Sequence, residues 1–202
     1  VNGQCDVLRG HCTKSNGGLY YRNFFEFEGA LTYLFSHPDA YQEMQDDTVA
    51  TLKKLLQVPE GYHVVFIQGG GSMQFDMHAA NFLKKKGGYI NTGVWSDKAM
   101  KAAQFFGETY EIASSKADHF TYIPAKEDFV VQPDTDYVYM TSNNTIHGTE
   151  WQTFPNFDIP VICDMSSDFL SRPVDVRQFD LIYAGAQKNM APAGLTVVIV
   201  RE

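Results

Sequence analysis

The segment VVFIQGGGS, residues 64–72, decides the fold. Its first four residues form a short apolar run, which is typical of a strand buried on both faces of a parallel sheet. Three glycines follow, and Met73, Met77 and Ala80 then recur at helical spacing. A strand, a glycine turn and a helix in this order predict one unit of an α/β sheet.

The same alternation continues on both sides of this segment. Apolar residues recur at spacings of three and four over residues 41–55 and predict a helix that ends before the turn Pro59-Glu60-Gly61. A third helix is predicted over residues 97–106, with Ala99, Ala102, Ala103 and Phe106 facing inward. Further strands are expected at residues 88–90, 110–113, 137–141, 161–163, 181–183 and 196–200. Strands interleaved with helices indicate an α/β fold with a mostly parallel seven-stranded sheet flanked by helices.

Composition bounds the domain count and the class of protein. The chain has 202 residues, of which 44% are hydrophobic and 20% charged, so it is a globular chain with room for one large domain. Residues 1–35 show no clean periodicity and are predicted to be an atypical N-terminal segment. Residues 36–202 carry the alternation of strands and helices and are predicted to form the single large domain.

Charge and cysteine content exclude several classes of partner. The net charge of −8 disfavours nucleic acid, because phosphate-backbone binding relies on clustered Lys and Arg. No apolar stretch reaches the roughly 20 residues that cross a bilayer, and we expect neither membrane insertion nor a secretory signal. The three cysteines are an odd number, which favours a reduced, cytoplasmic protein. Cys5, His11 and Cys12 lack a second ligand pair, so we expect no metal site.

The glycine turn of residues 68–72 is a candidate anion site. Without Cβ atoms, its backbone N–H groups can approach an anion, and the helix that follows adds positive partial charge at its N-terminus. It lacks the Gly-Lys-Ser/Thr ending of a nucleotide P-loop and the spacing of a dinucleotide fingerprint. The alternative is a turn that only joins strand to helix.

Two further polar residues follow predicted strands. Asp164 ends the strand 161–163 and is expected to face the ligand crevice, although an aspartate there can equally cap the next turn. Lys188 follows the strand 181–183 across small residues. So tight a setting would remove water from the amine, lower its pKa and free it as a nucleophile, whereas the alternative is a lysine of a surface loop.

The glycine turn of residues 68–72 (the anion cup), Asp164 and Lys188 come in the order in which many pyridoxal-phosphate enzymes present their cofactor ligands. The lysine reacts with the cofactor aldehyde, the carboxylate keeps the pyridine nitrogen protonated, and the cup anchors the phosphate. Trp95 follows the strand that ends near Asn91 and can either stack on the cofactor ring or pack in the core. Thr145 follows the strand 137–141 and is a candidate partner of the ring hydroxyl.

Four motifs make the resemblance to a known family specific. Residues 68–75, 143–151, 164–173 and 183–189 resemble phosphoserine aminotransferases, and the similarity runs from Ser36 to Glu202. The resemblance implies the large domain of a fold-type I, class-V pyridoxal-phosphate aminotransferase. It also implies transfer of an amino group from glutamate to 3-phosphohydroxypyruvate in serine biosynthesis, by a cytoplasmic homodimer.

The same resemblance implies the role of each site residue. Lys188 is the catalytic lysine that bonds to the cofactor, and Asp164 is the partner of the pyridinium nitrogen. Gly71 and Ser72 are implied to hold the cofactor phosphate, and Trp95 is implied to stack on the ring. Thr145 and Gln187 are implied to bond to groups around the ring.

Three departures from the family leave alternatives open. The family's opening Gly-Pro-Ala and Leu-Pro pattern is not found in residues 1–35. Pro38 stands where the family usually has a substrate-binding arginine, which leaves His37 as the candidate substrate contact. The sequence stops at Glu202, and we expect the small C-terminal domain to be absent. The alternatives are a truncated, catalytically impaired cofactor-binding fragment, another small-acid transaminase of the same fold, and a catalytically idle domain.

Overall fold

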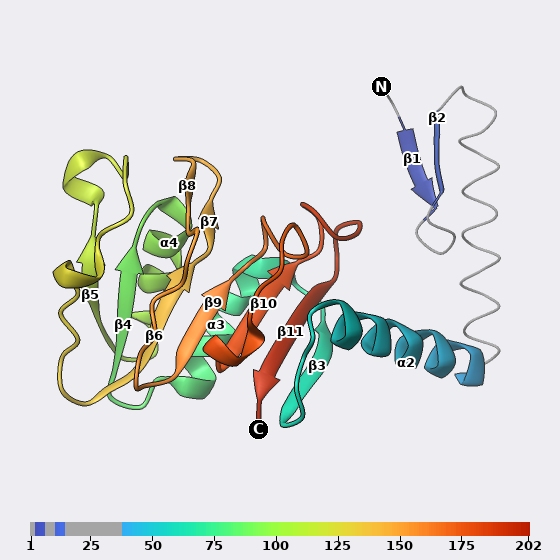
Figure 1. The fold of residues 1–202 in the computed structure, drawn as a ribbon, viewed down its shortest axis with the longest axis horizontal. Coiled ribbons are helices and arrows are strands. Elements are labelled where there is room, and N and C mark those ends of the chain that lie inside the picture. The colour runs from blue at the N-terminus through green and yellow to red at the C-terminus, as the bar shows by residue number, and fades with distance from the viewer. Residues whose placement is uncertain (1–2, 7–10, 15–37) are drawn as a thin grey trace. The chain divides into compact units, whose positions relative to one another are not determined.

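The computed structural model describes residues 3–6, 11–14 and 38–202 (Figure 1). The chain divides into two compact units, residues 1–54 and 55–202. In the first unit, strands β1 (Gly3–Asp6) and β2 (His11–Lys14) pair antiparallel, with the backbone of Cys5 opposite that of Cys12. The candidate substrate contact His37 lies outside the described residues.

Helix α2 (Pro38–Leu55) confirms the helix predicted over residues 41–55 and begins three residues earlier. A proline suits the first turn of a helix, because the N–H group that it lacks has no partner there. Asp39 lies in the first turn, and Lys53 and Lys54 lie in the last, so the charges complement the helix dipole.

The second unit is built on one seven-stranded sheet, in which all seven predicted strands are present. Along the sheet the strands follow the order β3-β11-β10-β9-β6-β4-β5, as Figure 1 shows. Neighbours from β10 to β5 are parallel, whereas β11 runs antiparallel to both β10 and β3, which confirms the mostly parallel sheet. The strands are β3 (Tyr62–Ile67), β4 (Lys86–Asn91), β5 (Glu108–Ser114), β6 (Thr135–Thr141), β9 (Val161–Asp164), β10 (Leu181–Gly185) and β11 (Thr196–Arg201).

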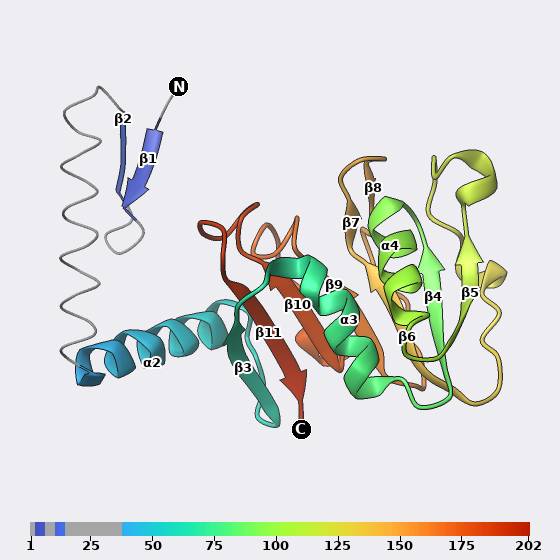
Figure 2. The same cartoon turned by 180° about the vertical axis from the view of Figure 1, so that it is seen from behind.

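Helices α3 (Gly70–Phe82) and α4 (Val94–Ala103) cover the same face of this sheet, which is turned toward the viewer in Figure 2. Helix α4 begins and ends three residues earlier than predicted. It begins early because the hydroxyl of Ser96 accepts the N–H groups of Thr92 and Gly93, which fixes the turn before it. Phe106 lies beyond the helix and is 45% exposed, so its predicted inward position is wrong.

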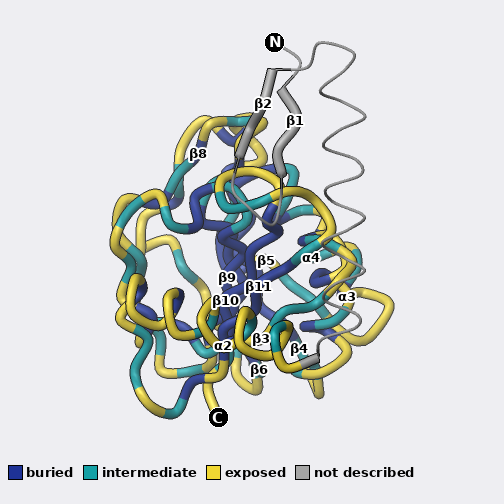
Figure 3. The backbone as a smooth tube through the Cα atoms, turned by 90° about the vertical axis from the view of Figure 1, so that its right-hand side faces the viewer, coloured by how far each residue is buried: buried dark blue, intermediate teal, exposed yellow. Residues whose placement is uncertain are grey.

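Four fully buried tyrosines fill the core beneath these helices. Their hydroxyls form two pairs, Tyr89 with Tyr137 at 2.6 Å and Tyr139 with Tyr183 at 2.7 Å. The imidazole of His78, on α3, contacts the Tyr89 hydroxyl at 3.0 Å. Buried hydroxyls are stable only when hydrogen-bonded, so the pairing accounts for so polar a core. In Figure 3 the backbone of the central strands β9, β10 and β11 has the colour of buried residues.

The remaining elements are short. Strands β7 (Asn143–Asn144) and β8 (Thr149–Glu150) form a small antiparallel hairpin after β6 that was not predicted, since two-residue strands carry no periodic pattern. The 3₁₀ helices are η1 (Lys116–Asp118), η2 (Lys126–Asp128) and η3 (Val176–Gln178).

Candidate active site

The glycine turn between β3 and α3 needs its glycines for two separate reasons. Gly69 and Gly70 have φ angles of 102° and 68°, in the left-handed region that side chains disfavour. Gly71 has no such angle, but a Cβ atom there would lie 2.7 Å from the Oγ atom of Ser166. The start of α3 therefore lies directly against the segment that follows β9.

The end of β10 meets the same place. The N–H group of Gly185 donates to the Oγ atom of Ser166 at 3.0 Å. A Cβ atom on Gly185 would lie 3.1 Å from the backbone nitrogen of Gly71 and 2.9 Å from the Oε1 atom of Gln187. Three segments that are far apart in the sequence thus converge, as expected at the carboxyl ends of parallel strands.

A pocket with an empty volume of about 400 Å³ opens at this meeting point. Six of the predicted site residues line it: Gly71, Ser72, Trp95, Asp164, Gln187 and Lys188. The other lining residues are Phe75, Thr141, Asn143, Ser166 and Ser167.

Asp164 presents a buried carboxylate to the pocket. The residue is 6% exposed, and its Oδ1 atom accepts the N–H group of Ser166 at 2.9 Å, so the capping role and the pocket-facing role coexist. Burial raises the pKa of the Asp164 carboxyl, because water no longer stabilises its charge. Hydrogen bonds from Ser166 and the positive charge of Lys188 oppose that rise.

Lys188 lines the same pocket and faces an aromatic ring. Its Nζ atom donates to the Oγ1 atom of Thr145 at 3.3 Å and lies 5.1 Å from the centre of the Trp95 ring. The side chain is exposed, so the predicted loss of hydration is wrong. The physical reason is that Lys188 follows the small residues of β10 into an open turn instead of lying among them.

Trp95 lines the pocket, and Thr145 lies next to Trp95. Trp95 stands at the start of α4 and is half-buried, and its Nε1 atom donates to the Oγ1 atom of Thr145 at 3.4 Å. The Nζ atom of Lys98 also lies over the ring, 4.9 Å from its centre. Thr145 lies beside the pocket lining, and it connects Trp95 to Lys188 through one hydroxyl.

The residues that sequence reasoning missed had usable signals. Thr141 is the last residue of β6, so the strand-end rule that found Asp164 applies to it as well. Ser166 and Ser167 directly follow Asp164, and Phe75 lies one helical turn after Gly71. Among the described residues, no group of three His, Cys, Asp or Glu side chains could hold a metal ion.

The arrangement suits a flat ligand that carries an anionic group. The glycine turn offers free N–H groups at the N-terminus of α3, while Trp95 offers an aromatic face. Asp164 provides a buried negative charge and Lys188 an accessible amine.

Comparison with known proteins agrees with this geometry. The sequence profile of the family described as Aminotransferase class-V matches residues 35–202. This chain therefore belongs to the class-V aminotransferase family. Its similar relatives within the family are phosphoserine aminotransferases. That of Bacteroides fragilis is 52% identical over 162 residues, covering 80% of this chain and 45% of the relative, and that of Geobacillus kaustophilus is 52% identical over 180 residues, covering 88% and 50%.

Solved structures give the same result. The phosphoserine aminotransferase of Bacillus circulans subsp. alkalophilus superposes with a TM-score of 0.79 at 47% identity, covering 81% of this chain and 46% of that one. The phosphoserine aminotransferase of Trichomonas vaginalis, described as PLP-bound, gives 0.75 at 38% identity, covering 80% and 49%. The chain thus spans about half the length of the relatives that it matches. Within the described residues, no helix is long and apolar enough to cross a membrane.

Proposed function

We propose that residues 36–202 form the cofactor-binding domain of a pyridoxal-phosphate-dependent transaminase, with the activity of a phosphoserine aminotransferase. The observation that carries this proposal is the convergence of Lys188, Asp164 and the glycine turn on one pocket. The identity of about 50% to phosphoserine aminotransferases over most of this chain supports it. Residues 1–35 lie outside this domain in the proposal.

The residues present fit pyridoxal phosphate. Gly71 leaves a cradle that any side chain would fill, and Ser72 beside it lies at the N-terminus of α3, where partial positive charge favours a phosphate. Gln187, two residues after β10, lines the same pocket and supplies an amide. Trp95 offers its ring as a stacking surface, and Thr145 offers a hydroxyl beside it.

Asp164 would hold a proton on the pyridine nitrogen. Its carboxylate is already oriented by the N–H group of Ser166 and is shielded from water. When bound, the cofactor supplies an electron sink for the negative charge that develops on a substrate's Cα atom. A buried negative charge is the group that keeps such a ring protonated, so the position of Asp164 suits this role.

Lys188 would attach the cofactor covalently and move the substrate proton. Its amine reaches the pocket on the side of Trp95 and Thr145. The hydroxyl of Thr145 orients the amine through the 3.3 Å hydrogen bond. A freed amine held in this way can take a proton from one carbon and return it to another.

The proposed substrates are glutamate and 3-phosphohydroxypyruvate, giving 2-oxoglutarate and phosphoserine in serine biosynthesis. The names of the similar relatives support this assignment. Pro38 at the start of α2 favours a second candidate, a transaminase of another small keto acid, because proline cannot replace a bidentate cation. His37 remains the proposed substrate contact of this chain.

We also propose a cytoplasmic homodimer. The dimer is what the resemblance to phosphoserine aminotransferases implies. The single described cysteine side chain, Cys163, is buried and unpaired, which suits a reducing compartment. Neither nucleic acid nor membrane belongs to the proposed partners.

Covalent attachment provides the first test. Pyridoxal phosphate is added to the chain, the visible absorption band is recorded, borohydride is added, and the modified peptide is found by mass spectrometry. We expect the modification on Lys188 and its loss in Lys188→Ala. Lys98→Ala is the matched control, because Lys98 lies equally close to Trp95. A band that survives Lys188→Ala would contradict the proposed role of Lys188.

Turnover provides the second test. Glutamate is supplied with 3-phosphohydroxypyruvate or with unphosphorylated keto acids, and 2-oxoglutarate is measured. Preference for the phosphorylated acceptor supports phosphoserine aminotransferase activity, whereas preference for an unphosphorylated acid favours the second candidate. Absence of turnover by a chain that binds the cofactor at Lys188 would favour a cofactor-binding domain that is idle by itself.

A further inference from the structure

Trp95 and Thr145 face each other although they come from distant parts of the chain. Trp95 stands at the start of α4, and Thr145 lies in the turn between β7 and β8. Their contact, 3.4 Å between the Nε1 and Oγ1 atoms, is longer than a strong hydrogen bond. Another residue must therefore fix the distance between them.

The side chain of Asn144 joins the two segments. Its Oδ1 atom accepts the backbone N–H group of Trp95 at 3.1 Å, and its Nδ2 atom donates to the Oγ1 atom of Thr92 at 2.9 Å. Asn144 and Thr92 are both fully buried. Both ends of the amide are thus used, so its orientation is fixed without water.

The fit is tight as well as polar. A Cβ atom on Gly93 would lie 2.5 Å from the Cγ atom of Asn144, so the amide packs directly against the backbone of the turn. The backbone oxygen of Asn144 accepts the N–H groups of His147 and Gly148, which closes the hairpin turn. The hydroxyl of Thr149 donates to the backbone oxygen of Thr92 at 2.7 Å, a second link between hairpin and turn.

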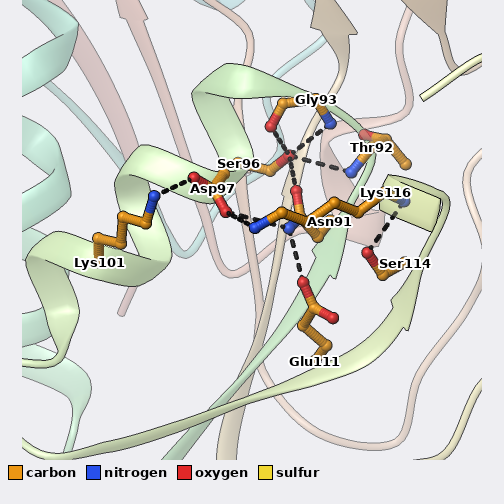
Figure 4. Close-up of polar contacts among 9 residues, drawn as sticks. All are labelled: Asn91, Thr92, Gly93, Ser96, Asp97, Lys101, Glu111, Ser114 and Lys116. Carbon is orange, nitrogen blue, oxygen red and sulfur yellow. Dashed lines mark hydrogen bonds and ion pairs between the residues drawn. The ribbon is translucent and has the colours of Figure 1, made fainter. Parts of the chain in front are cut away.

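The turn is also held from its other side, as Figure 4 shows. The hydroxyl of Ser96 accepts the N–H groups of Thr92 and Gly93, and lies 3.2 Å from the Oδ1 atom of Asn91. The Nδ2 atom of Asn91 in turn donates to Glu111 on β5 at 2.6 Å. The turn is therefore anchored to the sheet, and Asn144 attaches the hairpin to that anchor.

We infer that Asn144 is a positioning residue of the cofactor pocket. It sets the separation of Trp95 and Thr145, and Thr92 is its partner in doing so. The inference rests on the proposed function, because the proposed function assigns Trp95 and Thr145 to the pocket wall that receives the cofactor ring. Asn144 itself does not line the pocket and takes no part in proton transfer.

The test compares four variants of the chain, Asn144→Ala, Thr92→Val, Thr92→Ser and Ile112→Val. Thr92→Val removes the hydroxyl that accepts from Asn144, whereas Thr92→Ser keeps it. Ile112→Val shortens a buried side chain on β5 and serves as the control for stability alone. For each, three quantities are measured: the Kd for pyridoxal phosphate, the circular dichroism of the bound cofactor in the visible range, and the Tm of the cofactor-free chain.

We expect Asn144→Ala to raise the Kd about tenfold and to weaken the visible dichroism, because buried hydrogen bonds that hold the wall are lost. Thr92→Val should change both in the same direction, and Thr92→Ser should restore wild-type values. Ile112→Val should lower the Tm only. The inference is overturned if Asn144→Ala has the Kd for pyridoxal phosphate and the visible dichroism of the wild type. It is also overturned if Ile112→Val changes both quantities as Asn144→Ala does.

If Asn144→Ala does not fold, the two Thr92 variants decide. A difference between valine and serine in Kd and dichroism supports the inference, and equal values overturn it. A wild-type chain that gives no cofactor band overturns the proposed function and this inference with it. If the wild type and Asn144→Ala bind the cofactor equally well, only this inference is overturned, so the two failures are distinguishable.

Discussion

The Nζ atom of Lys188 lies 3.3 Å from the Oγ1 atom of Thr145, which also accepts from the Nε1 atom of Trp95. One hydroxyl thus serves an ammonium group and an indole. A hydrogen bond to a charged group is worth more than one between neutral groups. Thr145 is therefore the residue through which the amine and the aromatic wall keep a common position.

Replacing Thr145 by valine should weaken cofactor binding. The variant keeps the shape of the side chain but removes the acceptor of two hydrogen bonds. We expect the Kd for pyridoxal phosphate to rise about tenfold, because one of the two bonds is charge-assisted. An absorbance titration measures this, and Thr145→Ser, which keeps the hydroxyl, should bind as the wild type does. Equal binding by the valine and serine variants would contradict the role of the hydroxyl.

Gly71→Ala should destabilise the chain through one identifiable contact. The new Cβ atom would lie 2.7 Å from the Oγ atom of Ser166, but 3.7 Å from its Cβ atom, which is an ordinary contact. Overpacking of this kind costs about 1–3 kcal/mol. The Tm should fall in Gly71→Ala and recover in part when Ser166→Ala is added, although Ser166→Ala alone is destabilising. Additive effects in this double-mutant cycle would show that the clash is absent.

Asp164→Asn should stabilise the cofactor-free chain while abolishing turnover. Burial raises the pKa of the Asp164 carboxyl, so the unfolded chain releases this proton at a lower pH than the folded chain. The free energy of unfolding therefore falls as the pH rises above the ordinary pKa of an aspartate, because the folded chain must then hold a buried charge. At pH 7 we expect Asn to raise the Tm by on the order of 2–4 °C, a gain that shrinks toward pH 4.

The control for Asp164→Asn is Asp76→Asn, which removes an exposed carboxylate on α3. Its Tm should stay close to that of the wild type at both pH values. A fall in Tm on Asp164→Asn at pH 7 would mean that Lys188 and Ser166 stabilise the charge more than burial opposes it.

His78 should make the fold sensitive to acid. Burial lowers the pKa of His78 to about 4, against an ordinary value of 6.5. Because its Nδ1 atom lies 2.6 Å from the carbonyl oxygen of Gln74, Nδ1 donates there and Nε2 accepts from Tyr89. Between about pH 6.5 and 4 the unfolded chain binds a proton that the folded chain does not, so stability falls as the pH falls. The full loss is about 3 kcal/mol.

Urea unfolding at a series of pH values measures this loss. In His78→Gln the slope of unfolding free energy between pH 4 and 6.5 should flatten. His119→Asn is the matched control, since it removes an exposed histidine from a left-handed position that asparagine tolerates. If the slope of unfolding free energy against pH is unchanged in His78→Gln, the acid sensitivity does not come from His78.

The strands were predictable because of how they are buried. Parallel strands covered on both faces read as continuous apolar runs, and residues 161–163 and 181–183 are such runs. The start of α4 was not predicted, because its capping group is Ser96, which lies inside the helix and bonds back to the turn. Local spacing does not report such a bond.

The candidate site was predictable where a strand end sufficed. Asp164 ends β9 and Lys188 follows β10, and the sheet brings such positions to one edge. The contact of Gly71 with Ser166 joins segments that are far apart, and no spacing encodes it. The hydration of Lys188 was predicted wrongly, because small neighbours in sequence did not enclose it in space.

The antiparallel strand β11 has a consequence for synthesis of the chain. It is the only sheet partner of β3 among the described strands, and it pairs Thr196 with Ile67. On the ribosome, β3 therefore emerges long before a neighbour exists for its edge, and such long-range pairing forms slowly. The glycine turn that follows β3 therefore lacks the strand that holds β3 in the sheet until residues 196–201 have been made. Nascent chains that stop short of Thr196 should consequently fail to retain pyridoxal phosphate, even though every residue proposed to touch it has already been translated.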